Sequence, residues 1–119
     1  MIKGKTDAEI AQSMINSCIK YYDSQRSADY DTSNKVALWQ HNLSQELMAD
    51  IEFAKTVYFS VLNCSYERAQ AYSAVNCLKL EIFVDESVAI LESFSNRTDV
   101  GMLSIESKIN LSKYESGTL

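Results

Sequence analysis

The fold is decided by residues 35–62, KVALWQHNLSQELMADIEFAKTVYFSVL. Apolar side chains recur through this stretch at spacings of three and four residues, at Val36, Trp39, Leu43, Leu47, Ile51, Ala54, Tyr58 and Val61. This period predicts one amphipathic helix over 35–62. At about 1.5 Å per residue the helix would be about 40 Å long, so its apolar stripe needs an equally long partner.

The next periodic stretch, residues 65–94, is that predicted partner. Ser65 is a good helix N-cap, and the apolar period continues at Ala69, Tyr72, Val75, Leu78, Ile82, Ala89 and Ile90. The short connection at 63–64 predicts that the two long helices form an antiparallel hairpin. Residues 78–84, LKLEIFV, are apolar on more than one face, so we expect them in the centre of the bundle. They also alternate like a strand, but an isolated strand would have nothing to pair with.

Two shorter helices complete the prediction. Thr6 and Glu9 form a capping-box sequence, and the apolar period that follows predicts a helix over 7–22. Residues 23–33 are polar and aperiodic, which predicts a loop. Residues 100–114 fit a helix or a strand, and we expect a helix. The chain lacks proline and has only three glycines, which favours long helices. The sequence therefore predicts a single all-α domain over 1–119, a four-helix bundle with a long central antiparallel helix hairpin.

The charge of the chain limits its partners. The formal net charge is −5, and no cluster of Lys and Arg is present, so we expect no direct binding to nucleic acid. A protein partner with a basic surface is favoured instead. The N-terminus lacks the apolar core of a signal peptide, and no run of about 18 apolar residues could cross a membrane. We therefore expect a cytoplasmic protein without membrane contact.

No residue pattern indicates catalysis. The spacing of Cys18, Cys64 and Cys77 fits no metal or redox motif, so we expect three free thiols packed as small apolar residues. His41 is the single histidine and belongs to no motif. Acidic pairs occur at Glu46/Asp50 and Glu81/Asp85, but a di-iron bundle also needs Glu-x-x-His motifs, which are missing. The sequence predicts no enzyme activity, no metal site and no cofactor.

The candidate binding residues are tyrosines and carboxylates around the 23–33 segment. Tyrosine is enriched at binding hot spots, and acidic neighbours suit a basic partner. The predicted partner-binding residues are Tyr21, Asp23, Asp29, Tyr30 and Asp31, with Glu46 and Asp50 as a second patch. The alternative is structural: Tyr22 packs inside and the other residues cover it.

Residues 65–75, SYERAQAYSAV, resemble the turn and second helix of the phage helical-hairpin proteins that sequester cyclic oligonucleotide signals. The resemblance covers about a tenth of the chain. Glu81-Ile82-Phe83 stands where that family has an end rich in Trp, Asn and Ala, so the resemblance assigns the chain to no family. It implies an alternative function, the sequestration of a small signalling ligand such as a cyclic nucleotide.

The favoured function is that of a small acidic binding protein that neutralises or regulates a protein partner. Toxin-immunity proteins and phage inhibitors of host defence are of this type, being small, acidic and without catalytic motifs. The ligand-sequestering bundle is the second hypothesis, and a metal-dependent carboxylate-bundle enzyme is the third. A homodimer is also compatible with the sequence.

Overall fold

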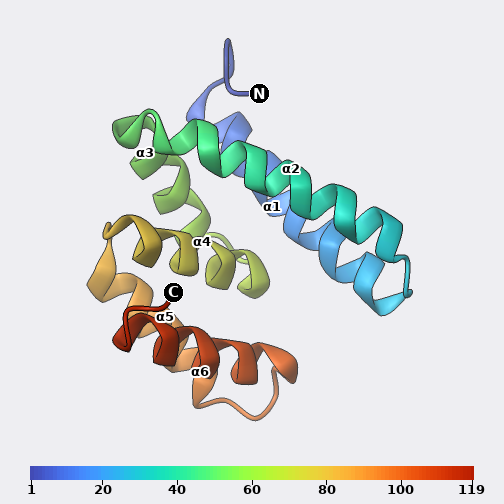
Figure 1. Ribbon diagram of the computed structural model, residues 1–119, viewed down its shortest axis with the longest axis vertical. Helices are drawn as coiled ribbons and strands as arrows, with labels where there is room; N and C mark the ends of the chain where they lie inside the picture. Colours follow the sequence, from blue (N-terminus) through green and yellow to red (C-terminus); the bar gives the residue numbers. More distant parts are fainter.

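A computed structural model describes residues 1–119 and contains helices but no strands (Figure 1). There are six helices: α1 Asp7–Arg26, α2 Tyr30–Met48, α3 Ile51–Leu62, α4 Glu67–Leu80, α5 Val84–Ser95 and α6 Met102–Glu115. The all-α prediction is confirmed, and so are the capping box at Thr6 and Glu9 and a helix in the C-terminal segment. The count of four helices is wrong, because both long predicted helices are broken.

The predicted helix over 35–62 is broken at Ala49 and Asp50, between α2 and α3. The Asp50 carboxylate accepts a hydrogen bond from the Phe53 amide at 3.3 Å and so caps the start of α3. Such a cap satisfies a backbone donor that has no partner within the helix. The new helix direction leaves Ile51 39% exposed, so its predicted place in the apolar stripe is wrong.

The predicted helix over 65–94 is broken at residues 81–83, inside the segment expected at the bundle centre. Glu81 has a left-handed backbone with φ 55°. The Ile82 and Glu81 amides donate to the carbonyls of Cys77 and Leu78 at 2.9 and 3.2 Å. These two bonds form a Schellman motif, which ends α4 and turns the chain into α5. The motif places Ile82 in the core beside the end of α4, but Glu81 is exposed.

The predicted loop over 23–33 is mostly helical. Helix α1 continues to Arg26 and α2 begins at Tyr30. Another Schellman motif closes α1, since the Asp29 amide donates to the Ser24 carbonyl at 2.8 Å and Ala28 has φ 58°. Asp29 caps α2. The antiparallel hairpin of the fold is therefore α1–α2, joined by a very short connection (Figure 1).

The helices pack around one apolar core in which α3 and α4 take central places. The largest fully buried side chains are those of Tyr58, Met14, Leu43, Leu47, Leu78 and Leu91. The predicted core positions Leu47, Leu78 and Ile82 are confirmed. The α1–α2 hairpin extends on one side of α4, while α5 and α6 lie on the other (Figure 1). None of the helices combines the length and the apolar character that a membrane span requires.

Candidate binding groove

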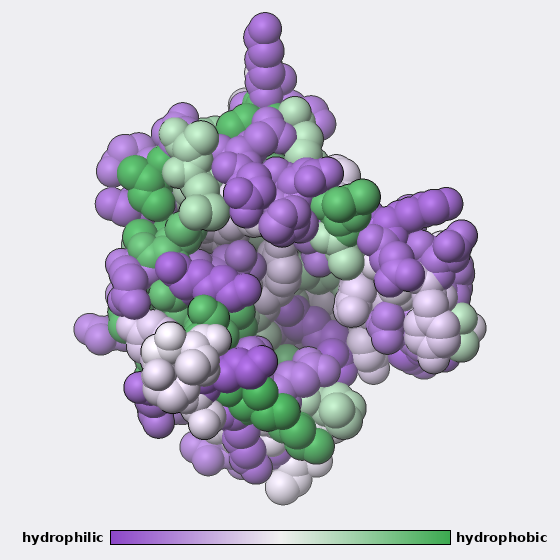
Figure 2. Space-filling model, viewed as in Figure 1, coloured by the Kyte–Doolittle hydropathy of each residue, from purple (hydrophilic) through white to green (hydrophobic).

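A groove of about 1240 Å³ lies over α4, between the α1–α2 hairpin and α6. Figure 2 shows a hollow in the surface between the α1–α2 hairpin and α6. The floor is one face of α4, where Arg68, Tyr72, Val75 and Lys79 follow at helical spacing. One wall comes from α1 and α2, including Tyr21, Tyr22, Gln40 and His41; the other comes from α6 and the segment before it, including Asp99, Met102, Glu106 and Ser107. The groove is therefore enclosed by helices on three sides and open on the fourth.

The charge of the groove lining is balanced, unlike that of the rest of the protein. The lining contains three basic side chains, Arg68, Lys79 and Arg97, and three acidic ones, Glu67, Asp99 and Glu106. The chain as a whole has 16 acidic and 11 basic residues. The net charge of −5 is therefore carried by the surface outside the groove.

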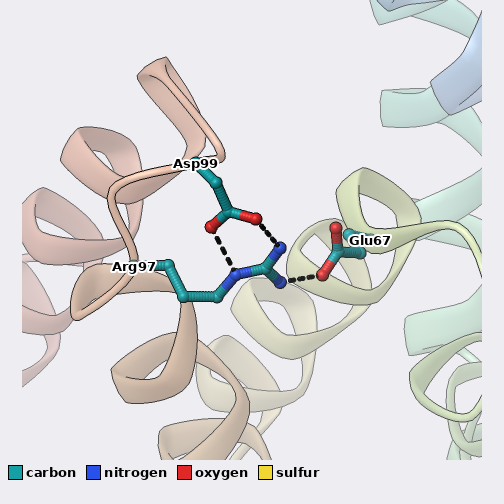
Figure 3. Close-up of polar contacts among 3 residues, drawn as sticks. All are labelled: Glu67, Arg97 and Asp99. Carbon is teal, nitrogen blue, oxygen red and sulfur yellow. Dashed lines mark hydrogen bonds and ion pairs between the residues drawn. The ribbon is translucent and has the colours of Figure 1, made fainter.

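An arginine network fixes one end of the groove (Figure 3). Arg97, in the segment before α6, donates to both carboxylate oxygens of Asp99 at 2.9 and 2.7 Å and also to Glu67 in the first turn of α4. The hydrogen bonds from Arg97 hold the pKa of Asp99 below its ordinary value. The network ties the α5–α6 connection to the start of α4, so it positions the α6 wall.

Arg68 links the two walls across the floor. Its guanidinium carbon lies 3.9 Å from the centre of the Tyr22 ring on α1, a cation–π contact. Toward α6, its nearest carboxylate oxygen belongs to Glu106 at 3.9 Å, which is too long for a hydrogen bond. The guanidinium donates no hydrogen bond within the protein. Burial raises the pKa of neighbouring Tyr66, and the charge of Arg68 partly offsets that rise.

Helix α6 packs with a partly polar face inward. It buries Leu103, Ser104 and Ser107 and exposes about half of each of Met102, Ile105 and Ile109. Ser104 donates to the Ser95 carbonyl at 3.0 Å, whereas the buried hydroxyl of Ser107, in the groove wall, has no partner. The exposed three form an apolar strip, green over α6 in Figure 2. These three residues recur at helical spacing within the segment predicted as a helix over 100–114, and the structure places them on the exposed side of α6.

The structure separates the predicted partner-binding residues. Tyr21 lines the groove and is 38% exposed. Asp23 and Tyr30 are exposed near the end of the α1–α2 hairpin, outside the groove lining. Asp29 is occupied as the cap of α2, accepting from the Thr32 hydroxyl at 2.7 Å. Asp31 is exposed and lies 4.0 Å from Lys35.

The predicted acidic pairs do not share helix faces. Glu46 is on α2 and accepts from the Met1 amino group at 3.2 Å, while Asp50 caps α3 beyond the helix break. Glu81 likewise ends α4 and accepts from the Tyr114 hydroxyl at 2.9 Å, whereas Asp85 belongs to α5. No three His, Cys, Asp or Glu side chains lie together in a way that could hold a metal ion. This arrangement gives no support to the metal-dependent alternative.

The cysteines are unpaired, as predicted. Cys18 and Cys77 are buried, and burial raises the pKa of their thiols to about 12 and about 11. A thiol with such a pKa stays protonated at neutral pH and is a poor nucleophile. Cys18 borders the groove but offers no reactive group to it.

Sequence reasoning missed most of the groove. Tyr72 and Val75 were assigned to a core stripe, and Arg68 was not singled out. The available signal was the spacing of Arg68, Tyr72, Val75 and Lys79, which places two cations, an aromatic ring and an apolar side chain on one helix face. That signal becomes visible only once the other face of α4, with Ala69, Ala74 and Leu78, is known to fill the core.

No protein-family model matches the chain, and the searches of curated proteins and of solved structures also found no match.

Proposed function

We propose that the protein is a binding protein that captures a helical segment of a protein partner in the groove over α4. The observation that carries the proposal is the groove itself, which α1, α2, α4 and α6 line and which no other helix of the protein fills. Helix-in-groove binding is a common way for helical proteins to hold a partner segment. A partner whose segment is held in the groove could not use that segment for its own activity, so capture would neutralise or regulate it.

The dimensions of the groove support a helical occupant. The floor from Arg68 to Lys79 covers eleven residue steps, about 16 Å at 1.5 Å each. An α-helix rises about 5.4 Å per turn, and the groove follows the whole of this floor. About three helical turns would therefore fit.

The lining supports a protein occupant by its chemistry. Tyr21, Tyr22, Tyr66 and Tyr72 border the groove, and tyrosine gives large contact area with few rotatable bonds. The apolar strip Met102, Ile105 and Ile109 continues from the groove rim over α6. An exposed apolar strip beside a concave surface is typical of an interaction site. The acidic surface outside the groove favours a partner that is basic around the captured segment.

Sequestration of a small signalling ligand is the second candidate. Small-molecule sites usually measure about 300–1000 Å³ and enclose most of the ligand, whereas this groove is larger and open along one side. A small ligand would leave much of the tyrosine-lined surface uncovered. The geometry therefore favours the protein segment.

Site-specific photo-crosslinking in the cells that make the protein tests the proposal. A photoreactive amino acid replaces Val75 in the groove floor, and a matched variant carries it at Leu38, which is 61% exposed and outside the groove. We expect the Val75 probe to crosslink one short segment of one protein and the Leu38 probe not to do so. Equal labelling from both positions, or native mass spectra showing a co-purified small molecule in the groove, would reject the proposal.

A further inference from the structure

Arg68 is a partly buried cation in the groove floor whose hydrogen-bonding capacity is unused. A guanidinium has five N–H donors in a planar fork. Arg97, the other arginine of the groove, donates to Asp99 and Glu67. Arg68 has only the ring of Tyr22 at 3.9 Å and a loose ion pair with Glu106 at 3.9 Å, although only 25% of its side chain is exposed.

The position of Arg68 is prepared for a planar anion. The Tyr22 ring, 3.9 Å from the guanidinium carbon, helps to hold the group in place, so less conformational entropy is lost when a ligand binds. None of the guanidinium N–H donors has a hydrogen-bond partner within the protein, and 25% of the side chain is exposed. A carboxylate accepts two parallel hydrogen bonds from a guanidinium.

We infer that Arg68 anchors the captured segment by a bidentate ion pair with one Asp or Glu side chain of the partner. This inference rests on the proposed function and defines the segment further: a helix of about three turns with apolar side chains and one central carboxylate, in a partner that is basic elsewhere. The groove lining has equal numbers of basic and acidic side chains, so it does not repel the carboxylate of the segment. The acidic surface outside the groove attracts the basic residues of the partner that surround the segment.

Glu106 makes a distinctive prediction possible. Its carboxylate is the nearest anion to Arg68 and is half exposed, so it competes electrostatically with the incoming carboxylate. Removing its charge in Glu106→Gln should strengthen the binding of an acidic segment by a few-fold. A role of Arg68 that is only structural would give no gain.

The experiment is a selection from a displayed library of helix-forming peptides of about 15 residues, a length at which isolated helices begin to be stable. Wild-type protein and Arg68→Gln are used in parallel. We expect the wild type to enrich peptides with one fixed Asp or Glu flanked by apolar residues at helical spacing. The Arg68→Gln selection should lose the acidic position and keep the apolar ones.

Titration calorimetry with the best peptide completes the test. Arg68→Gln and the peptide's own acid-to-amide change should each weaken binding by at least about 30-fold, and the two changes together should add little more. Arg68→Lys should recover only part of the affinity, because an ammonium cannot form the fork. Lys35→Gln is the matched control: this cation on α2 lies outside the groove lining and its side chain is 81% exposed, so the substitution should change affinity by about twofold or less.

The two levels of the proposal fail differently. If no peptide is selected, or if bound peptides leave Val75 untouched in crosslinking, the helical-segment function is wrong. If peptides bind in the groove without an acidic preference, or if Arg68→Gln selects the same sequences, the anchor is wrong and the function stands. Binding of inorganic phosphate or a cyclic dinucleotide that depends on Arg68, with no peptide binding, overturns both.

Discussion

Asp29 and Asp50 each cap a helix N-terminus, and this role distinguishes them from the exposed carboxylates around them. Sequence reasoning treated both as free binding residues, because an aspartate in a polar stretch fits a cap and a surface charge equally well. Only the position of the helix start decides between these roles. Asp23 and Asp31 remain free to meet a partner.

Alanine substitution separates the two roles. Asp29→Ala removes the hydrogen bonds to the Thr32 amide and hydroxyl, so we expect its thermal midpoint to fall by several degrees. Asp31→Ala affects only an exposed pair with Lys35 and should leave the midpoint within about one degree. Equal midpoints for the two variants in a thermal melt would contradict the start of α2 at Tyr30.

Buried ionisable groups predict how stability depends on alkaline pH. Burial raises the pKa of Cys18 and Tyr58 to about 12 and that of Cys77 to about 11, from ordinary values of 9.0 for Cys and 10.0 for Tyr. These groups ionise more easily in the unfolded chain, so stability is retained below pH 9 and falls as pH rises toward 12. Thermal melts from pH 7 to pH 11 should show this fall. Substituting both cysteines by alanine should reduce it, and a midpoint that stays constant to pH 11 would contradict the burial of these groups.

At the level of elements, the sequence predicted which residues are helical far better than where helices end. The apolar periods at 7–22, 35–62 and 65–94 were correct as helical regions, and the capping box at Thr6 marked a true start. Two helix ends that the sequence analysis placed wrongly, those of α1 and α4, share one structural feature. Ala28 and Glu81 adopt the left-handed conformation of a Schellman motif, which is usually given to glycine. Without a glycine near residue 81, no helix end is predicted there. The end of α1 is predicted too early, at residue 22 and not at Arg26, because the 23–33 segment is polar and aperiodic.

Glycine at position 81 tests this explanation. A residue with a side chain loses about 1 kcal/mol in the left-handed region compared with glycine. We expect Glu81→Gly to be more stable than Glu81→Ala by about 0.5–1 kcal/mol in chemical denaturation, since both lose the bond to Tyr114. In an unbroken helix the order would be reversed, with glycine less stable than alanine by about the same amount.

Helix α6 offers a test of orientation. Leu103 is 5% exposed and contributes to the core, whereas Ile105 is 49% exposed. Leu103→Ala should therefore lower the free energy of unfolding by about 2–3 kcal/mol, and Ile105→Ala by less than about 1 kcal/mol. Denaturant titration of the two variants measures both values. A larger loss for Ile105→Ala would mean that the Met102, Ile105 and Ile109 strip faces the core.

At the scale of the whole molecule, the breaks in the helices create the groove. An unbroken hairpin over 35–94 would have closed the fold as a regular bundle. Because α4 ends at Leu80 and α5 turns away, α6 is set apart from the α1–α2 hairpin and α4 is left uncovered between them (Figure 1). The groove could not be predicted from helical periods alone, because it depends on how faces of α1, α2, α4 and α6 meet.

The central claim is that this groove holds a partner helix, and blocking it by size tests the claim most directly. The segment found by crosslinking is titrated against wild type, Val75→Trp in the groove floor and Leu38→Trp on the exposed face of α2. Val75→Trp should keep the wild-type thermal midpoint and lose at least about 30-fold in affinity, the scale of a binding hot spot. Leu38→Trp should bind as the wild type does. Undiminished binding to a folded Val75→Trp would place the partner elsewhere and contradict the account.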